Sequence, residues 1–280
     1  MKLINSSVDI IEQKSGIDGI YKMIECAGRT CYKSEDKITE DSAKEFVDRM
    51  IKSKHGAMLE HGTVYLTAYD DYAEDLLKYQ TNKYSKCKSY TEYLEDGKSI
   101  KVCVTTNLRV LVENNWLDDL KYIGVPTELH EKRITARFTC DRGVSHEIVR
   151  HRVMSFAQES TRYCNYSKDK FGNELTFIKP SWYSKTLENK HGGFERFLED
   201  SQSLYTSLLD QGYLPQEARA CLPNALKTEI VVTGFESDWE HFFSLRSPKY
   251  GAQGVHPDMA KLADELYEKL NNVNTDNKTE

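Results

Sequence analysis

The stretch RITARFTCDRGVSHEIVRHR, residues 133–152, passes from a strand pattern to a helix pattern and ends in a dense group of basic residues. Its apolar side chains first alternate and share one face: Ile134, Ala136, Phe138 and Cys140. This period of two predicts a half-buried β-strand. Arg142-Gly143 then predicts a turn, and Ser145 is a candidate N-cap for a helix that runs through SHEIVRHR.

The rest of the chain adds elements of both kinds. Apolar spacing predicts helices over residues 41–56, 110–124, 237–246 and 256–270, and strands over 63–69, 100–106 and 228–235. Gly56 is the expected end of the first helix, Asp96-Gly97 is a hairpin signal, and Ser237 with Glu240 has capping-box spacing. Strands and helices do not alternate strictly. We therefore expect an α+β fold, a single domain over residues 1–270 with a central sheet flanked by helices, and a frayed tail over 271–280.

The totals exclude several classes of protein. A net charge of -6 over 280 residues argues against non-specific nucleic-acid binding. No apolar stretch approaches the roughly 20 residues of a membrane helix, and the N-terminal residues do not read as a signal peptide. The seven cysteines are scattered without a C-x-x-C pair. We expect a reduced, cytoplasmic protein that binds neither nucleic acid nor membrane.

Positive charge gathers in one region of this acidic chain. Residues 131–170 hold nine Lys or Arg against five Asp or Glu, a local net charge of +4. Such a region attracts a small anionic molecule. A simpler interpretation is that Arg150, His151 and Arg152 lie in the last turn of a helix, where cations are stabilised by about 0.3–1 kcal/mol. The polar run QESTRY that follows favours a binding site, because a solvated loop gains little from so many directional groups.

The motifs exclude two common kinds of site, a glycine-rich nucleotide-binding loop and an H-E-x-x-H zinc site. The chain contains neither G-x-G-x-x-G nor G-x-x-x-x-G-K-[ST], so a nucleotide would be held by side chains and ordinary helix ends. His146-Glu147 is not part of H-E-x-x-H, because position 150 is Arg. No metal site is predicted.

Four segments carry a resemblance to a known family. RHR at 150–152 followed after seven residues by Ser160, extended by QESTRY, is similar to the signature of the flavin-dependent thymidylate synthases, the ThyX family. LEHGTVYLT with Glu60 and His61, PQEARACLP, and HFFSLR resemble three further segments of that family. The chain between His61 and the signature is longer than in compact members, so we expect a family insertion at about 65–130.

The resemblance implies a reaction. Members of the family convert dUMP to dTMP with 5,10-methylenetetrahydrofolate as the carbon donor, and use FAD as cofactor and NADPH as reductant. They form homotetramers whose sites are shared between subunits. Their flavin site is not Rossmann-like, and the uracil is not attacked by an enzyme cysteine.

The resemblance also implies roles for individual residues. Arg246 is the candidate catalytic residue, because a permanent cation would promote ionisation of the uracil ring. The candidate cofactor-binding residues are Thr63, Arg150, His151, Arg152, Gln158, Ser237 and His241. The candidate dUMP-binding residues are Glu147, Ile148, Val149, Arg150, Gln158, Glu159, Ser160, Thr161, Arg162, Arg219 and Arg246.

Several positions depart from compact members. Phe235, Ser237 and His241 stand where those members have polar or basic flavin contacts, and Cys31 stands where they have a serine. The segment Trp239, Phe242 and Phe243 is interpreted as core packing. His61 is either a core histidine or a flavin contact. Cys164 and Cys221 lie close to the signature, but free cysteines are most often small buried hydrophobes.

Three hypotheses follow. The first is a flavin-dependent thymidylate synthase. The second is a flavoenzyme of the same fold that acts on another pyrimidine nucleotide or carbon donor. The third is a binding module that uses the basic turn to recognise RNA or a phosphorylated partner.

Overall fold

A four-stranded antiparallel sheet forms the centre of the molecule in the computed structural model, which describes residues 1–94, 97–168, 171–184 and 193–276. Its strand order is β2-β6-β9-β7, with β2 at Ser7–Ile11, β6 at Arg133–Asp141, β9 at Lys227–Phe235 and β7 at Ser155–Gln158. The predicted strands over 133–140 and 228–235 are confirmed as β6 and β9. Ala136, Phe138 and Cys140 are fully buried, as the alternation predicts.

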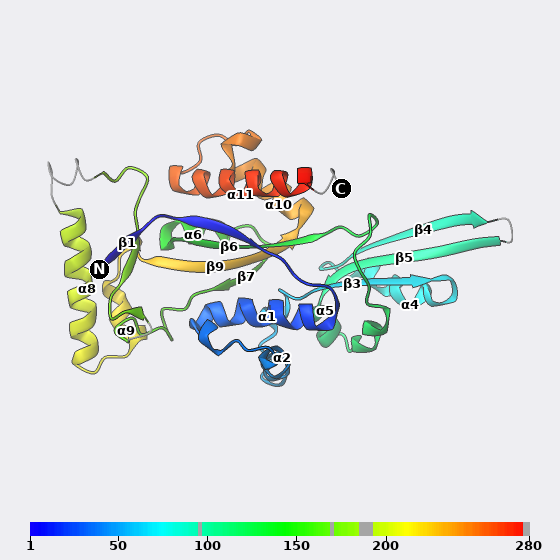
Figure 1. Cartoon of the computed structure of the whole chain (residues 1–280), viewed down its shortest axis with the longest axis horizontal. Helices are drawn as coiled ribbons and strands as arrows, with labels where there is room; N and C mark the ends of the chain where they lie inside the picture. The colour runs from blue at the N-terminus through cyan, green and yellow to red at the C-terminus, as the bar shows by residue number, and fades with distance from the viewer. Residues whose placement is uncertain (95–96, 169–170, 185–192, 277–280) are drawn as a thin grey trace.

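Helices cover both faces of this sheet (Figure 1). The long helix α11 (Pro257–Asp276) and α10 (Glu236–Arg246) pack on one face, where Ile230 and Val232 of β9 meet Trp239 and Phe242. The helix α1 (Gly16–Tyr32), backed by α2 (Ser42–Lys52), lies on the other face, which Val231 presents. The expected sheet flanked by helices is confirmed, and Trp239, Phe242 and Phe243 are core residues.

A second sheet extends the molecule to one side (Figure 1). It has the order β3-β5-β4, with β3 at Thr63–Tyr69, β5 at Gly97–Asn107 and β4 at Lys86–Leu94. Leu94 pairs with Gly97, which confirms the predicted hairpin, although Asp96 itself lies outside the described residues. Val64, Leu66 and Val104 bury one face of the sheet.

At the opposite end, a third cluster surrounds helix α8 (Phe194–Asp210) and the parallel pair β1 (Lys2–Ile4) and β8 (Thr176–Ile178). The remaining short elements are α3 (Gly56–Leu59), α4 (Glu74–Leu77), α5 (Leu108–Glu113), α6 (Arg142–Ile148), α9 (Pro215–Ala218), and the 3-10 turns at Glu35–Lys37, Asp70–Tyr72, Lys78–Thr81, Leu117–Tyr122, Arg219–Cys221 and Pro248–Tyr250.

Three boundary predictions are wrong. Gly56 does not end the first predicted helix. That helix, α2, ends at Lys52, and Gly56 is the first residue of the next helix, α3. The helix expected over 110–124 is broken after α5, where Asn115 takes a left-handed conformation with φ 58°, and resumes as the 3-10 turn Leu117–Tyr122. The expected frayed tail over 271–280 is wrong as far as Asp276, where α11 ends, and residues 277–280 lie outside the described residues.

The seven cysteines are all free thiols. Within the described ranges, no helix is both long and apolar enough to cross a bilayer.

Candidate functional site

Helix α10 carries the candidate catalytic arginine at its last residue. The helix begins after Phe235, whose backbone N–H donates to Asp238 Oδ2 at 2.9 Å, so an acidic residue in the first turn satisfies the helix start. The prediction that Ser237 caps this helix is wrong. Ser237 lies within the first turn, and its hydroxyl donates to Glu131 Oε1 at 2.5 Å. Pro248 follows the helix and keeps it from continuing past Arg246.

Arg246 meets residues from the basic turn. Its Nε donates to His151 Nε2 at 3.1 Å, and its Nη1 donates to Glu147 Oε2 at 2.5 Å. The Arg246 and Glu147 side chains are 19% and 25% exposed, so this ion pair remains open to a ligand. The structure thus brings Arg246 into contact with His151 and Glu147, which precede it in sequence by 95 and 99 residues.

The helix before the basic turn is α6, and its cap differs from the prediction. Asp141, not Ser145, is the N-cap, since its side chain accepts from Val144 N at 2.9 Å. Ser145 lies inside the helix, where its hydroxyl donates to Arg142 O and accepts from Gln158 Nε2. The helix ends at Ile148, which is buried. Arg150, His151 and Arg152 therefore lie beyond the helix, in a separate turn.

His151 is the buried member of that turn. Its ring packs edge-on against Phe242, with centroids 4.8 Å apart. Burial, with added repulsion from Arg246 and His241, lowers the pKa of His151 to about 4. The imidazole is therefore neutral at neutral pH. Since Nε2 accepts from Arg246, we assign the ring proton to Nδ1.

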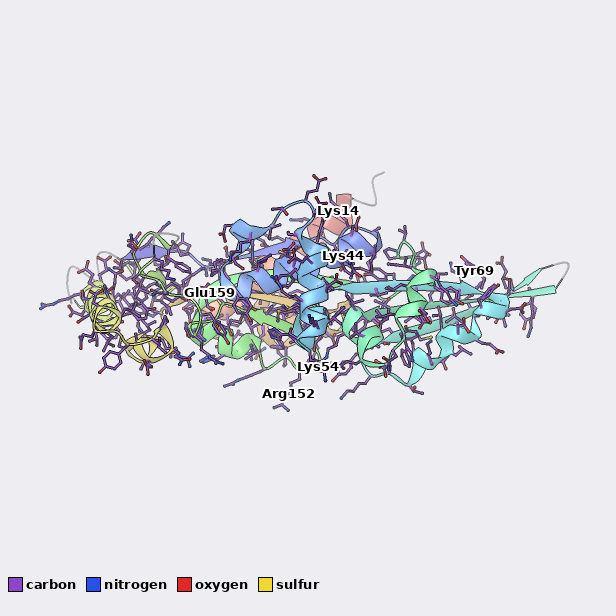
Figure 2. The ribbon with its side chains drawn as sticks, turned by 90° about the horizontal axis from the view of Figure 1, so that it is seen from below. Lys14, Lys44, Lys54, Tyr69, Arg152 and Glu159 are labelled. Atoms are coloured by element: carbon purple, nitrogen blue, oxygen red, sulfur yellow. The ribbon has the colours of Figure 1, made fainter. Side chains whose placement is uncertain are left out.

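The two arginines of the turn point outward. Arg150 and Arg152 are both exposed, and neither guanidinium bonds to any residue within the described ranges. Figure 2 shows Arg152 projecting away from the body. Val149, on the same turn, is 38% exposed. Val153, which follows, has a φ of 83°, a conformation that is strained for a β-branched residue.

The predicted substrate loop, residues 158–162, divides into an inner and an outer part. Gln158 donates to the hydroxyls of Ser145 and Thr228, at 2.9 and 3.2 Å. Glu159 is buried, and its carboxylate accepts from Tyr166 at 2.8 Å and from Lys227 at 2.9 Å. These two side chains are engaged inside the chain, so in this protomer they support the loop.

The outer part of the loop offers donors to solvent. Thr161 is buried and accepts from Arg219 Nη1 at 3.0 Å, which ties this arginine to the loop. Arg219 and Arg162 are exposed, and Ser160 is half-buried. The loop is anchored on the helix α1 side, because Ser160 N donates to Cys31 O at 2.9 Å. Among the residues the structure describes, no hydrogen bond joins the Thr161–Arg219 pair to the Arg246 group.

The remaining cofactor candidates lie near the start of β6 and on α10. Thr63 is buried at the start of β3, and its hydroxyl accepts from Arg133 Nη1 at 3.3 Å. His241 is exposed on α10, and its ring lies 6.3 Å from that of His151. His61 is fully buried, with Nδ1 2.9 Å from Thr233 Oγ1 and no partner for Nε2. Burial and the charge of Arg133 lower the pKa of His61 to about 3.

Arg133 is a residue that the sequence analysis missed. Its guanidinium donates to Glu60 O at 3.0 Å and to the hydroxyls of Thr63 and Ser155. Its Nε is buried without a partner. Burial lowers its pKa to about 10, so it stays charged at neutral pH. The signal available in the sequence was an arginine at the first position of a strongly apolar strand.

Arg133 also borders two cavities. One, of about 790 Å³, lies between β2, β6, α10 and α11, and of the predicted site residues only Thr63 lines it. The other, of about 100 Å³, is bordered by Val153, Ser155 and Phe235, next to the basic turn. In the described part of the chain, no group of three or more His, Cys, Asp or Glu is arranged to hold a metal ion.

The donor set fits a flavin dinucleotide. Two unpaired guanidinium groups at Arg150 and Arg152 suit a diphosphate. His241 adds an exposed donor on the neighbouring helix, and the small cavity beside Val153 and Phe235 is apolar on part of its wall. These residues could hold FAD from the side of the basic turn.

Comparison with known proteins shows the family of the chain. Residues 75–274 match the protein family described as "Thymidylate synthase complementing protein". A "Flavin-dependent thymidylate synthase" of Geobacter sulfurreducens is 33% identical over 132 residues, which cover 47% of this chain and 55% of that protein. One of Pyrococcus furiosus is 35% identical over 107 residues, 38% of this chain and 43% of that protein. The chain thus spans about half the length of these curated relatives.

Among solved structures, a UMP/dUMP methylase, PolB, from Streptomyces cacaoi bound with 5-Br dUMP covers 96% of this chain and 92% of its own, with a TM-score of 0.45 and 16% identity. The resemblance read from the basic signature is confirmed by the family match. The chain belongs to the thymidylate synthase complementing protein family.

Proposed function

We propose that this protein is a flavin-dependent thymidylate synthase that methylates dUMP to dTMP. The proposal includes 5,10-methylenetetrahydrofolate as carbon donor, FAD as cofactor and NADPH as reductant. The family match and the names of its relatives support it. The observation that carries it is the placement of Arg246 between neutral His151 and Glu147, at the end of a helix fixed in the core.

Arg246 is suited to stabilise a uracil anion. Carbon 5 of uracil reacts with an electrophilic carbon only when the ring becomes electron-rich. Arg246 has Nε and Nη1 bonded within the chain, and Nη2 makes no hydrogen bond to a described residue. Nη2 is therefore the edge that remains for a base oxygen. A fixed cation in a partly water-excluded site stabilises developing negative charge strongly.

His151 and Glu147 position this cation. A neutral imidazole accepts from Nε without adding a second positive charge beside it, and the Glu147 carboxylate fixes the plane of the guanidinium. Glu147 also lies beside Arg246 Nη1, so a ligand that contacts this nitrogen would lie close to the Glu147 carboxylate. We propose that it contacts the nucleotide, together with the exposed Val149 of the same turn.

The dUMP phosphate is assigned to the outer loop. Ser160, Arg162 and Arg219 offer a hydroxyl and two guanidinium groups, and Thr161 holds Arg219 in place. Arginine forks bind phosphate oxygens in pairs. Buried Ile148 and the engaged Gln158 and Glu159 are assigned supporting roles beneath the nucleotide.

FAD supplies the reducing equivalents when it is bound. Arg150, Arg152 and His241 are the residues that we expect to hold its polar parts, with His151, Thr63 and Ser237 at the margin of the same region. The chain's own task there is to bind and orient the cofactor and to exclude water from the uracil. The flavin site so formed is not Rossmann-like.

Cysteine chemistry is not part of the proposal. Cys164 is fully buried. Burial raises the pKa of Cys221, and raises that of Cys31 to about 11, which disfavours the thiolate that a nucleophile requires. The seven free thiols also support the proposal that the protein works in the reducing cytoplasm.

We propose a homotetramer with shared sites, since the Thr161–Arg219 group and the Arg246 group do not bond to each other within one chain.

A test of the function begins with the visible spectrum. The purified protein should carry a flavin that NADPH bleaches under nitrogen, faster with dUMP present. A protein that cannot be loaded with FAD is not this enzyme.

The second step is tritium release from 5-labelled dUMP, measured with and without methylenetetrahydrofolate. Folate-dependent dTMP formation supports the proposal. Flavin reduction without any turnover of dUMP would instead indicate a related flavoenzyme that acts on another nucleotide or carbon donor.

A further inference from the structure

Strand β4 forms the outer edge of the second sheet. All nine of its residues, Lys86–Leu94, pair with β5 on one side. No strand in the described part of the chain pairs with its other side. In Figure 1 the β4–β5 hairpin reaches beyond the body, and no ribbon runs along the outer edge of β4. A straight edge of this length presents a row of open backbone donors and acceptors that favours pairing with another strand.

The sequence of β4, KCKSYTEYL, is self-complementary about its midpoint. An antiparallel copy centred on Tyr90 is the register that pairs the whole strand with itself. It places Lys88 opposite Glu92 twice, Ser89 opposite Thr91 twice, and Tyr90 opposite Tyr90. Opposed residues in antiparallel strands point to the same face, so each Lys–Glu pair would be in contact.

We propose that β4 pairs antiparallel with β4 of a second copy of this chain, about a two-fold axis at Tyr90. The contact would join two three-stranded sheets into one sheet of six strands. A two-fold contact of this kind is isologous, so each β4 edge takes one partner strand and is then fully paired. The strand that occupies this edge is therefore β4 of the second copy.

The side chains along the strand support a protein contact. Tyr90 is 51% exposed and Tyr93 is 84% exposed. Aromatic residues are enriched in protein–protein interfaces, so these exposed side chains favour a contact with another protein chain. Tyr90 and Tyr69 of β3 both lie opposite Lys101 of β5, so one face carries an aromatic row that a second sheet would lengthen. Figure 2 shows Tyr69 on this extended part of the molecule.

This inference goes beyond the proposed function, because none of its residues belongs to the candidate site. Its first test is disulfide cross-linking of the full chain. Tyr90→Cys should form a covalent dimer on mild oxidation, because opposed Cα atoms are about 4.5–5.5 Å apart and disulfides span about 4.4–6.8 Å. Unsubstituted protein, with its seven native cysteines, is the background control.

The register has its own control. Lys88→Cys and Glu92→Cys should not cross-link alone, because each position would lie about 13 Å from its own copy, at roughly 3.3 Å per residue. A mixture of these two variants should cross-link to each other. Cross-linking of Lys88→Cys to itself as fast as Tyr90→Cys, or no dimer from Tyr90→Cys, would overturn the proposal.

A charge exchange provides the second test. Lys88→Glu should weaken self-association, measured by sedimentation velocity, by roughly threefold to tenfold, since two attractive pairs become repulsive. The double variant Lys88→Glu, Glu92→Lys should recover it. If the single and double variants associate alike, Lys88 and Glu92 do not face each other across the contact, and the proposal is wrong. FAD binding is measured in parallel, so a failure of the proposed function is recognised separately.

Discussion

Arg246 is fixed in place before any ligand arrives. His151 occupies its Nε and Glu147 its Nη1, and both partners come from the end of α6 and the turn after it. The helix beneath it is secured by Trp239, which is 1% exposed. An arginine at a helix end would gain only about 0.3–1 kcal/mol from the helix dipole, which does not require such fixed partners.

Substitution of Arg246 tests its catalytic role. Arg246→Ala should still bind FAD and be reduced by NADPH, but should lose C5 tritium release from dUMP by a factor on the order of 10²–10³, the usual cost of one preorganised donor. Arg246→Lys should recover little, because an ammonium cannot replace the planar fork. Arg196→Ala on α8 is the matched control. Near wild-type release from a folded Arg246→Ala would refute the assignment.

His151 gives the fold a pH dependence. Its pKa is about 4 when folded and about 6.5 in an unfolded chain, so the unfolded state binds the proton more readily between these values. Stability therefore falls as the pH is lowered through this window. His151→Gln should remove about 2 kcal/mol of the loss between pH 6.5 and 5, since one pKa unit corresponds to about 1.4 kcal/mol.

Urea unfolding of both proteins at the two pH values measures this difference. His61, with a pKa of about 3, contributes to both proteins alike and cancels in the comparison. An unchanged pH dependence in His151→Gln would show that this imidazole is not held neutral by the fold.

The turn between α6 and β7 is strained. Val153 has φ 83°, whereas Val149 at the other end of the turn has φ -67°. A β-branched residue at positive φ costs about 1–3 kcal/mol, and glycine does not bear this cost. Val153→Gly should therefore raise the free energy of unfolding by about 1 kcal/mol. Val149→Gly, at an ordinary backbone conformation, should lower it by about 0.5–1 kcal/mol. Equal destabilisation in urea would mean that Val153 is not strained.

Elements with a strong apolar period could be predicted from the sequence. β6, β9 and α11 bury the faces that their spacing indicated, because burial itself creates the pattern. The start of α6 could not, since Asp141 ends a strand and caps a helix at once, and a one-dimensional pattern does not separate these roles. The break at Asn115 was missed because apolar spacing continues on both sides of it.

The site was predictable only in part. The signature indicated Arg150, His151 and Arg152, but the contact of His151 with Arg246 depends on how β9 and α10 fold back across the sheet. Arg133 was missed for the same reason, since its partners Glu60 and Thr63 precede it by about 70 residues. The expected insertion at about 65–130 stays a prediction.

Across the molecule, the candidate residues form two groups. Arg246, His151 and Glu147 form one, and Thr161 with Arg219, beside Arg162, forms the other.

If each active site combines the first group of one subunit with the second group of another, two different inactive variants should complement each other. Arg246→Ala and Arg162→Ala each spoil one group. Subunits of the two, unfolded together and reassembled one to one, should recover roughly one quarter of wild-type dTMP formation, since half of each group is intact and pairing is random. Each variant taken alone through the same procedure is the control. Mixtures that stay as inactive as the single variants would show that one subunit builds the whole site, and light scattering on the same samples establishes whether the tetramer has formed.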